Sequence, residues 1–316
     1  MQIILQTILG IVGLALLTYG ADFLVRGGVR IAEVLKIPTA IIGLTLVAFA
    51  TSAPELVVSI DSALKGVGDI SLGNVIGSNI CNIALILGLS AMITPMTVNR
   101  KILRVDTPIL LIASVLVAFF VIYFHGINRL CAFVFLAFFA LFMCVNIRDA
   151  MKRPTENATD EPSAKKPLSM WLATVFVVGG VGALVFGAKL FVDAAIFAAK
   201  AFNVSDAVIG LTIVAVGTSL PELATSAVAA FKGETDIAVG NVVGSNIFNI
   251  LAILGIAPAI TPIRANNIQA TDLAVMGAVT IMMTLMMITG KKIQRWEGAA
   301  LFISYAAYIV WLVMNI

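Results

Sequence analysis

The chain has 316 residues, of which 60% are hydrophobic and 12% are charged, and its mean hydropathy is +1.07. Soluble domains carry about a quarter charged residues, so this composition excludes a protein with a water-covered globular surface. The formal net charge is only +3, and the 3 cysteines all fall in hydrophobic runs, which indicates no disulfide framework. The composition predicts an integral membrane protein surrounded by the lipid bilayer.

Ten candidate membrane spans follow in chain order. A helix needs about 20 mostly apolar residues to cross about 30 Å of hydrocarbon. Two candidates, 38–64 and 206–231, each contain one glutamate deep in the run. The others are uncharged, namely Met1–Ala21, Ile70–Asn99, Thr107–Asn128, Leu130–Ile147, Pro167–Ala188, Ile237–Ile263, Leu273–Gly290 and Gly298–Ile316. The predicted fold class is an all-α membrane protein of ten transmembrane helices.

One segment, 149–166, differs from the rest of the chain. Its sequence DAMKRPTENATDEPSAKK is charged, rich in Pro, Ser and Thr, and has no hydrophobic periodicity. Such a composition is typical of a flexible connector. The segment therefore divides the chain into two halves, 1–148 and 167–316, with five predicted spans each.

The basic residues are distributed unevenly between the two sides. If both termini lie outside, 15 of the 20 Lys and Arg residues fall on the inner side. They are Arg26, Arg30 and Lys36; Arg100, Lys101 and Arg104; Arg148, Lys152, Arg153, Lys165 and Lys166; Lys232; and Lys291, Lys292 and Arg295. The positive-inside rule then predicts outer termini, a cytosolic linker and inner loops that carry these clusters. Basic clusters also bind nucleic acid or lipid headgroups, but topology explains them without a ligand.

An internal repeat is the strongest feature of the sequence. The segment Ile42–Pro95 aligns with Ile209–Pro262 without a gap, and more than half of the aligned positions are identical. The repeats extend over about 38–100 and 205–267. Because each half has an odd number of spans, the halves have opposite orientations. Such inverted five-helix repeats are typical of secondary transporters, with a substrate site near the midplane at the repeat interface.

Glu55 and Glu222 occupy equivalent positions in the two copies, deep in apolar spans. An unpaired charge at this depth is costly. One alternative is a pairing with buried Lys or Arg, but the only basic residues of the aligned segments Ile42–Pro95 and Ile209–Pro262 are Lys65 and Lys232, about ten residues away near the span ends. A second alternative is a protonated, neutral glutamate. Two carboxylates without a fixed counter-charge predict a site for mobile cations.

Polar groups accompany both glutamates. Pro54 and Pro221 have no N–H, so the carbonyl groups of Ala50 and Gly217 lose their helical donors. A broken helix at membrane depth is tolerated where it lines a polar cavity. On the following span, side chains at i and i+4 face the same side. The candidate oxygen donors are Thr51, Ser52, Ser78 and Asn82 in the first copy and Thr218, Ser219, Ser245 and Asn249 in the second.

These donors are hard oxygens, without thiolate or imidazole groups in reach, which favours calcium or sodium over zinc, copper or iron. Calcium accepts about six to eight oxygens in flexible geometry, whereas magnesium prefers an octahedral site with retained water. Two carboxylates balance one divalent ion or two monovalent ions. This equivalence predicts exchange of calcium against sodium, with the transported ions as the only ligands and no cofactor.

The paired motifs TSAPEL…GNVIGSNICN and TSLPEL…GNVVGSNIFN resemble the two alpha-repeats of the cation/calcium antiporter superfamily, and in particular its prokaryotic sodium/calcium exchangers. The resemblance implies that the two glutamates bind calcium and that neighbouring oxygens form sodium sites. The implied ligands are the side chains of Glu55, Ser52, Ser78, Asn82, Glu222, Ser219, Ser245 and Asn249 and the carbonyl groups of Ala48, Thr51, Ala215 and Thr218. Some sodium/calcium exchangers have Asp where this chain has Asn249, which leaves the ion coupling open.

The resemblance also implies alternating access in the plasma membrane of a prokaryote. The first and sixth spans, near 5–25 and 172–198, would slide past a core of eight spans. Alternatives are a proton-coupled or potassium-dependent exchanger of the same superfamily, a passive channel, or an intramembrane enzyme with Ser52 or Ser78 as nucleophile. An enzyme needs a general base and an asymmetric site, so we expect a transporter, without a nucleic-acid partner or an obligatory protein partner.

Overall fold

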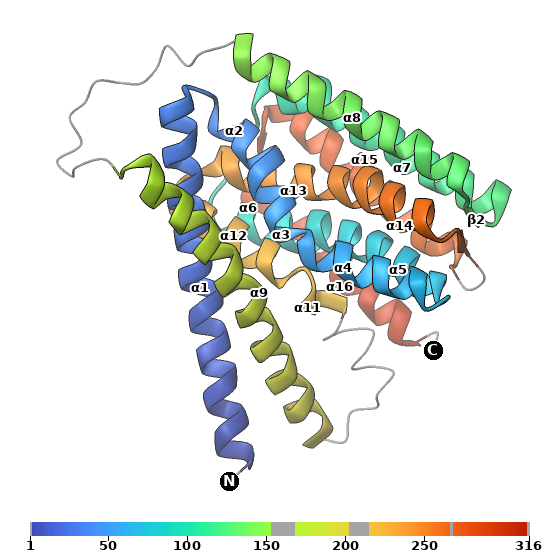
Figure 1. Ribbon diagram of the computed structural model, residues 1–316, viewed down its shortest axis with the longest axis horizontal. Coiled ribbons are helices and arrows are strands. Elements are labelled where there is room, and N and C mark those ends of the chain that lie inside the picture. Colours follow the sequence, from blue (N-terminus) through green and yellow to red (C-terminus); the bar gives the residue numbers. More distant parts are fainter. Residues whose placement is uncertain (1, 153–167, 202–214, 266–267, 315–316) are drawn as a thin grey trace.

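The computed structural model describes residues 2–152, 168–201, 215–265 and 268–314 (Figure 1). These residues are almost entirely helical, because apolar segments can satisfy their backbone N–H and C=O groups internally only in helices. The elements of the first half are α1 Gln2–Leu35, α2 Thr39–Ile42, π-helix η1 Gly43–Val47, α3 Ala48–Thr51, α4 Ala53–Leu64, α5 Gly68–Ile80, π-helix η2 Cys81–Leu87, α6 Gly88–Ile93, β1 Met96–Thr97, π-helix η3 Ile102–Asp106, α7 Thr107–Phe124, β2 Gly126–Ile127 and α8 Arg129–Lys152.

The second half follows a similar order in its described residues, without a counterpart of η3. Its elements are α9 Met170–Ala201, α11 Ala215–Gly217, α12 Leu220–Phe231, α13 Thr235–Ile247, π-helix η5 Phe248–Ile253, α14 Leu254–Ile260, β3 Ile263–Arg264, α15 Ala270–Gly290, β4 Lys292–Ile293 and α16 Arg295–Met314.

The number of spans agrees with the prediction as far as the described residues reach. They contain 8 helices long and apolar enough to cross a membrane, and a bent pair, Thr39–Thr51 and Ala53–Leu64, whose axes differ by 45°, forms a further span. The predicted counterpart of this pair, 206–231, begins within 202–214, which lies outside the described residues. Most of the predicted linker 149–166 also lies outside them. The all-α membrane fold is confirmed, and the count of ten helices stays a prediction.

The first helix is longer than predicted. Arg26 and Arg30 were expected in an inner loop, but α1 continues through both of them to Leu35. Local ion pairs explain the difference: the Arg26 Nε lies 2.8 Å from the Asp22 Oδ2 at i,i+4, and the Arg30 Nη1 lies 2.9 Å from the Glu33 Oε2 at i,i+3. Such pairs stabilise helices, so the charged residues extend α1 instead of ending it.

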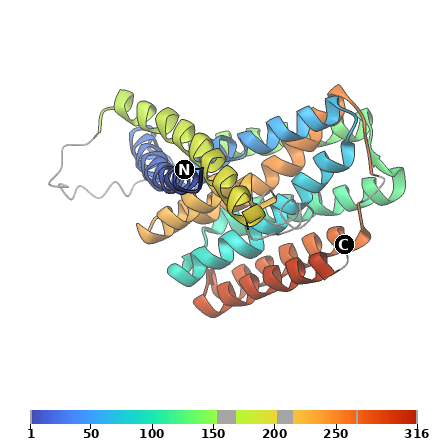
Figure 2. The ribbon, with the colours of Figure 1, turned by 90° about the horizontal axis from the view of Figure 1, so that it is seen from below.

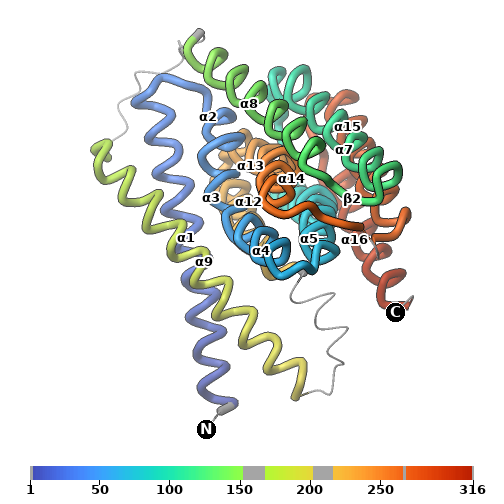
Figure 3. Tube along the Cα trace, turned by 45° about the vertical axis from the view of Figure 1, so that its right-hand side comes forward, coloured from blue at the N-terminus to red at the C-terminus, as the bar shows by residue number. Residues whose placement is uncertain are grey.

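Two continuous spans, each with a π-helical stretch, form the centre of the molecule, α5–η2–α6 and α13–η5–α14. The most apolar stretch of the span 235–260 is entirely buried inside the protein. The corresponding stretches of the outer spans are mostly exposed on the surface of the bundle. The helices α1 and α9 pack together at one edge of the bundle, and one end of the pair extends beyond it (Figures 1 and 3). Seen from below, the two helices lie on one side of the molecule (Figure 2).

Two short antiparallel ribbons connect the halves. Each pairs a strand of one half with a strand of the other, and the alignment of the two repeats relates β1 to β3. The ribbons are therefore equivalent under the repeat, as inverted halves require. Their registers are Met96↔Ile293 and Thr97↔Lys292 for β1 and β4, and Gly126↔Arg264 and Ile127↔Ile263 for β2 and β3.

Glycines bring α1 and α9 into close contact. A Cβ atom added to Gly180 would lie 2.7 Å from the Gly20 carbonyl oxygen, and one added to Gly20 would lie 2.9 Å from the Gly180 carbonyl oxygen. A Cβ on Gly187 would likewise lie 2.9 Å from the Gly13 carbonyl oxygen. Small residues let helix backbones approach in membranes, so these glycines hold the two helices together as a pair.

Substitution of Gly180 by Leu should separate α1 from α9, because backbone atoms of Gly20 and Leu24 occupy the space of the new side chain. Overpacking of this kind costs about 1–3 kcal/mol. We expect a lower thermal-unfolding midpoint of the purified protein in detergent. Gly179→Leu is the matched control, since no described atom lies within 4 Å of a Cβ at Gly179. Equal midpoints for the two variants would contradict the glycine contact.

Candidate functional site

The two repeat motifs break their helices at equivalent serines. The backbone of Ser52 has φ −83° and ψ 4°, and that of Ser219 has φ −89° and ψ 7°, so neither continues an α-helix. A new helix starts after each serine, α4 at Ala53 and α12 at Leu220. Proline occupies the first turn of both helices, where its missing N–H costs nothing. The predicted break in each motif is present.

Glu55 and Glu222 lie in the first turns of α4 and α12, and both side chains are fully buried. Each carboxylate is near the positive end of its helix dipole, which favours a negative charge. The nearest repeat lysines are engaged elsewhere: the Lys65 Nζ lies 2.6 Å from the Asp61 Oδ2, and Lys232 pairs with Asp22. Within the described residues neither glutamate forms an ion pair, so a pairing with buried Lys or Arg is excluded there.

Reciprocal hydrogen bonds join the two repeats. The Ser52 hydroxyl donates to the Glu222 Oε1 at 3.0 Å, and the Ser219 hydroxyl donates to the Glu55 Oε1 at 3.2 Å. These bonds are the same interaction seen from the two copies of the motif. They place the first turns of α4 and α12 against each other and bring both carboxylates into one polar cluster. The predicted meeting of the two glutamates at the repeat interface is therefore present.

Further side chains cross the interface from the central helices. The Thr51 hydroxyl donates to the Asn241 Oδ1 at 3.2 Å and lies 3.4 Å from the Ser245 hydroxyl. The Asn82 amide donates to the Asn246 Oδ1 at 3.3 Å, joining η2 to α13. The two central spans thus contact each other through amides and hydroxyls inside an apolar core. Buried polar groups of this kind fix one arrangement of the helices when they are paired.

Several buried polar atoms nevertheless have no hydrogen-bond partner among the described residues. Buried polar groups in proteins are normally bonded, so an accumulation of unbonded ones calls for an explanation. Among the residues of the two motifs the unpartnered oxygens are the Glu55 Oε2, Glu222 Oε2, Ser78 Oγ, Asn79 Oδ1, Asn82 Oδ1, Thr218 Oγ1 and Asn249 Oδ1, and the amide nitrogens of Asn79, Asn246 and Asn249 also lack partners. These oxygens are all hard, and two belong to carboxylates. No cluster of three or more His, Cys, Asp or Glu side chains occurs in the described residues.

Only some of the ion ligands predicted from the sequence contact the glutamates in the structure. Ser52 and Ser219 contact the glutamates directly, and Thr51 contacts Ser245. The Ala48 carbonyl accepts from the Thr51 hydroxyl at 3.3 Å. Ser78, Asn82 and Asn249 are buried on the central helices without a hydrogen bond to either glutamate, and Thr218 and Ala215 lie in the segment that leads into the second break. The Ala215 side chain is outside the described part of the chain.

Sequence reasoning missed a pair of asparagines that support the site. The Asn74 amide donates to the Glu55 carbonyl oxygen at 3.2 Å and to the Ser59 hydroxyl at 3.0 Å. Its counterpart Asn241 donates to the Ser226 hydroxyl at 3.0 Å. The repeat itself points to this pair, because Asn74 and Asn241 occupy equivalent positions in the two copies. Each lies four residues before the serine, Ser78 or Ser245, of the same helix. They bind α4 to α5 and α12 to α13.

Known proteins are similar to this chain over nearly its whole length. A family model described as sodium/calcium exchanger protein matches residues 5–148 and 172–314. The inner membrane protein YrbG of Escherichia coli (strain K12) is 39% identical over 318 residues, which cover 98% of this chain and 97% of that protein. The sodium/calcium exchanger MaX1 of Methanosarcina acetivorans is 35% identical over 340 residues, which cover 95% of this chain and 96% of that protein.

A solved structure is also similar to the chain. The sodium-calcium exchanger NCX_Mj, soaked with 10 mM Na+ and 10 mM Sr2+, superposes with a TM-score of 0.83 at 33% sequence identity, and the match covers 98% of each chain. The family model covers both halves, and the fold agrees with the structural match. The chain therefore belongs to the sodium/calcium exchanger protein family, a family of multi-pass membrane transporters and not of enzymes.

Proposed function

We propose that this protein is a secondary antiporter that exchanges calcium for sodium across a prokaryotic plasma membrane. The observation that carries the proposal is the buried oxygen cluster around Glu55 and Glu222, which has two carboxylates and no basic partner in the described residues. A cation entering the cluster would satisfy oxygens that otherwise lack donors. Burial of two such charges would be costly without one.

The chemistry of the oxygens favours calcium and sodium. Carboxylate, amide, hydroxyl and carbonyl oxygens are the ligands that calcium accepts in flexible geometry. Both glutamates would contact calcium, and the neutral oxygens would complete calcium and sodium sites. The proposed neutral ligands are the side chains of Ser52, Ser78, Asn82, Ser219, Ser245 and Asn249 and the carbonyl groups of Ala48, Thr51, Ala215 and Thr218.

Alternating access would come from movement of α1 and α9 relative to the bundle. These helices contact each other through glycines at backbone distance, so they move most easily as one body. The ion ligands lie instead on α3–α4, α5–η2, α11–α12 and α13–η5, whose polar contacts cross the repeat interface. Sliding of the pair would open the cluster to one side and then to the other while the ligands keep their places.

Glu55→Gln and Glu222→Gln should each abolish calcium exchange in proteoliposomes. The amide keeps the size of the side chain and an acceptor for the serine hydroxyl, but a bound divalent ion would retain an uncompensated charge in a low-dielectric site. Glu297→Gln is a matched control, because Glu297 is a buried carboxylate that caps α16 by accepting from the Gln294 N–H at 2.7 Å. A folded Glu55→Gln protein with normal calcium flux would refute the assignment of the site.

We further propose that both termini lie outside and that the linker 149–166 lies in the cytosol. The grouping of basic residues supports this orientation, since the Lys232–Asp22 ion pair and the β1–β4 ribbon gather positive residues at the linker side. Single cysteines introduced at Ala158 and at Ile316 should react differently with an impermeant thiol reagent in intact cells, with labelling at Ile316 alone. Labelling at Ala158 alone would contradict this orientation and place the linker outside.

Sodium, and not protons, should drive the exchange, and the exchange should carry net charge. Two sodium ions neutralise the glutamates, and a further sodium in the neutral oxygens makes the sodium-loaded site more positive than the calcium-loaded one. Each net charge then couples to about 2.3 kcal/mol per 100 mV. In liposomes clamped with potassium and valinomycin, sodium-driven calcium flux should change with voltage. Calcium flux that did not depend on sodium but followed a pH gradient would identify a proton-coupled exchanger. Calcium flux that required potassium would identify a potassium-dependent exchanger.

A further inference from the structure

A basic pocket that shares no lining residue with the glutamate cluster lies where the N-terminal end of η3–α7 meets the C-terminal end of α8. Its volume is about 400 Å³, and its lining consists of Arg100, Lys101, Arg104, Arg148, Asp149 and two valines. We call these residues, with Val105 and Val145, the α7–α8 pocket. Four of the lining side chains are cationic and one is anionic. The pocket also faces the start of a long helix, where the helix dipole favours an anion.

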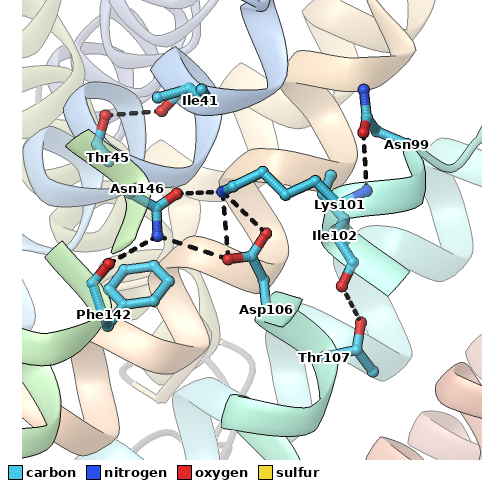
Figure 4. A network of polar contacts seen from close by, with 9 residues as sticks. All are labelled: Ile41, Thr45, Asn99, Lys101, Ile102, Asp106, Thr107, Phe142 and Asn146. Carbon is cyan, nitrogen blue, oxygen red and sulfur yellow. Dashed lines mark hydrogen bonds and ion pairs between the residues drawn. The ribbon is translucent and has the colours of Figure 1, made fainter. Parts of the chain in front are cut away.

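A buried polar network fixes the base of the α7–α8 pocket (Figure 4). The Lys101 Nζ lies 3.3 Å from the Asp106 Oδ2 and donates to the Asn146 side-chain oxygen. The Asn146 amide donates to the Phe142 carbonyl oxygen at 2.9 Å, and the Lys101 N–H donates to the Asn99 Oδ1 at 2.9 Å. The Asp106 and Lys101 side chains are 0% and 8% exposed. This network ties α8 to the start of α7, so the pocket has a rigid base.

Three guanidinium groups of the pocket are available to a ligand. Arg100, Arg104 and Arg148 are all exposed, and none of them forms an ion pair with another described residue. The charge of Lys101 is already balanced by Asp106. Arginine binds phosphate through two parallel N–H donors, which makes it the preferred residue for planar, bidentate contacts to phosphate oxygens. The excess positive charge therefore suits a phosphate-bearing anion.

The surroundings of the pocket are those of a membrane surface. Ile147 and Met151, on the α8 turns beside Arg148, are 53% and 79% exposed, and along α7 Ile112 and Val115 are 49% and 66% exposed. A molecule with its charged end in the pocket could lay apolar chains on this face. An inorganic anion has no apolar part and would make no favourable contact with these apolar side chains.

The second half of the chain provides an internal comparison. The corresponding stretch of the second half, residues 265–272 between β3 and the first turn of α15, contains no Lys or Arg. Asp272 there accepts from the Tyr308 hydroxyl at 2.9 Å and caps α15. The repeated fold is thus built without basic residues at this place. The arginines of the α7–α8 pocket are therefore an addition to the repeat and not a requirement of it.

We propose that the α7–α8 pocket binds the phosphate group of an anionic phospholipid, with Arg100, Arg104 and Arg148 as its donors and the exposed faces of α7 and α8 against the acyl chains. Basic pockets between transmembrane helices on the cytosolic side bind lipid headgroups in this way. The site is separate from the ion cluster. Its occupancy is measurable without transport.

The test is native mass spectrometry of the purified full-length protein titrated with phosphatidylglycerol, phosphatidylcholine or inorganic phosphate. We expect bound phosphatidylglycerol and little phosphatidylcholine. Arg104→Gln combined with Arg148→Gln should weaken phosphatidylglycerol binding by at least about tenfold for each arginine removed, because each guanidinium would donate hydrogen bonds to a charged phosphate. The matched control combines Lys291→Asn with Lys292→Gln, which removes the same charge from the same side outside the pocket. Asn is chosen because Lys291 has φ 51°, a conformation that Asn tolerates.

Equal weakening in the two double variants would overturn the proposal, because it would show a diffuse attraction to surface charge. Binding of inorganic phosphate that depends on the arginines, without phosphatidylglycerol binding, would overturn the lipid as the ligand. Size-exclusion chromatography and the unfolding midpoint establish that the variants are folded. If the double variant were unfolded, Arg100→Gln alone would replace it, with Lys291→Asn alone as its control.

Discussion

The structure depends on two buried carboxylates that have no basic partner among the described residues. Glu55 and Glu222 can occupy the middle of an apolar bundle because each sits at the N-terminal end of a helix and accepts a hydrogen bond from the other repeat. Those serine hydroxyls are available only because the helices break at Ser52 and Ser219. The proline, the break, the serine and the glutamate therefore form one unit, which the repeat supplies twice in opposite orientations.

The two serine–glutamate bonds at the centre obey the symmetry of the repeat, and this symmetry is lost toward the periphery. Asp22 of α1 binds both Arg26 and Lys232, so α1 is linked to the end of α12 by charge. The same alignment of the two halves places Lys189 of α9 at the position of Asp22 and Lys65 at that of Lys232. Two lysines cannot form this bridge, and Lys65 pairs with Asp61 in its own helix. The α1–α9 pair is thus tied to the bundle by this ion pair at one side only.

The sequence allowed prediction of the spans, the repeat, the break and the residues at the repeat interface, because each depends on composition or on identity between two copies. It did not predict how the copies contact each other. The bond from Thr51 to Asn241 joins residues 190 positions apart that are not equivalents in the repeat, and only the packing of helices brings them together. Nor did hydropathy predict that α1 passes through Arg26, since a side-chain ion pair that the hydropathy index ignores sustains the helix.

The reciprocal bonds also explain why a transporter benefits from an inverted repeat. Ligands contributed equally by the two copies lie at the same depth from either surface, so neither side of the membrane is favoured by the ligands themselves. Access can then change through elements that carry none of the ligands. The helices α1 and α9 meet this condition, because they contact each other at glycine backbones and contribute no side chain to the oxygen cluster. In the movement proposed for that pair, the bonds between Ser52 and Glu222 and between Ser219 and Glu55 would hold the cluster together.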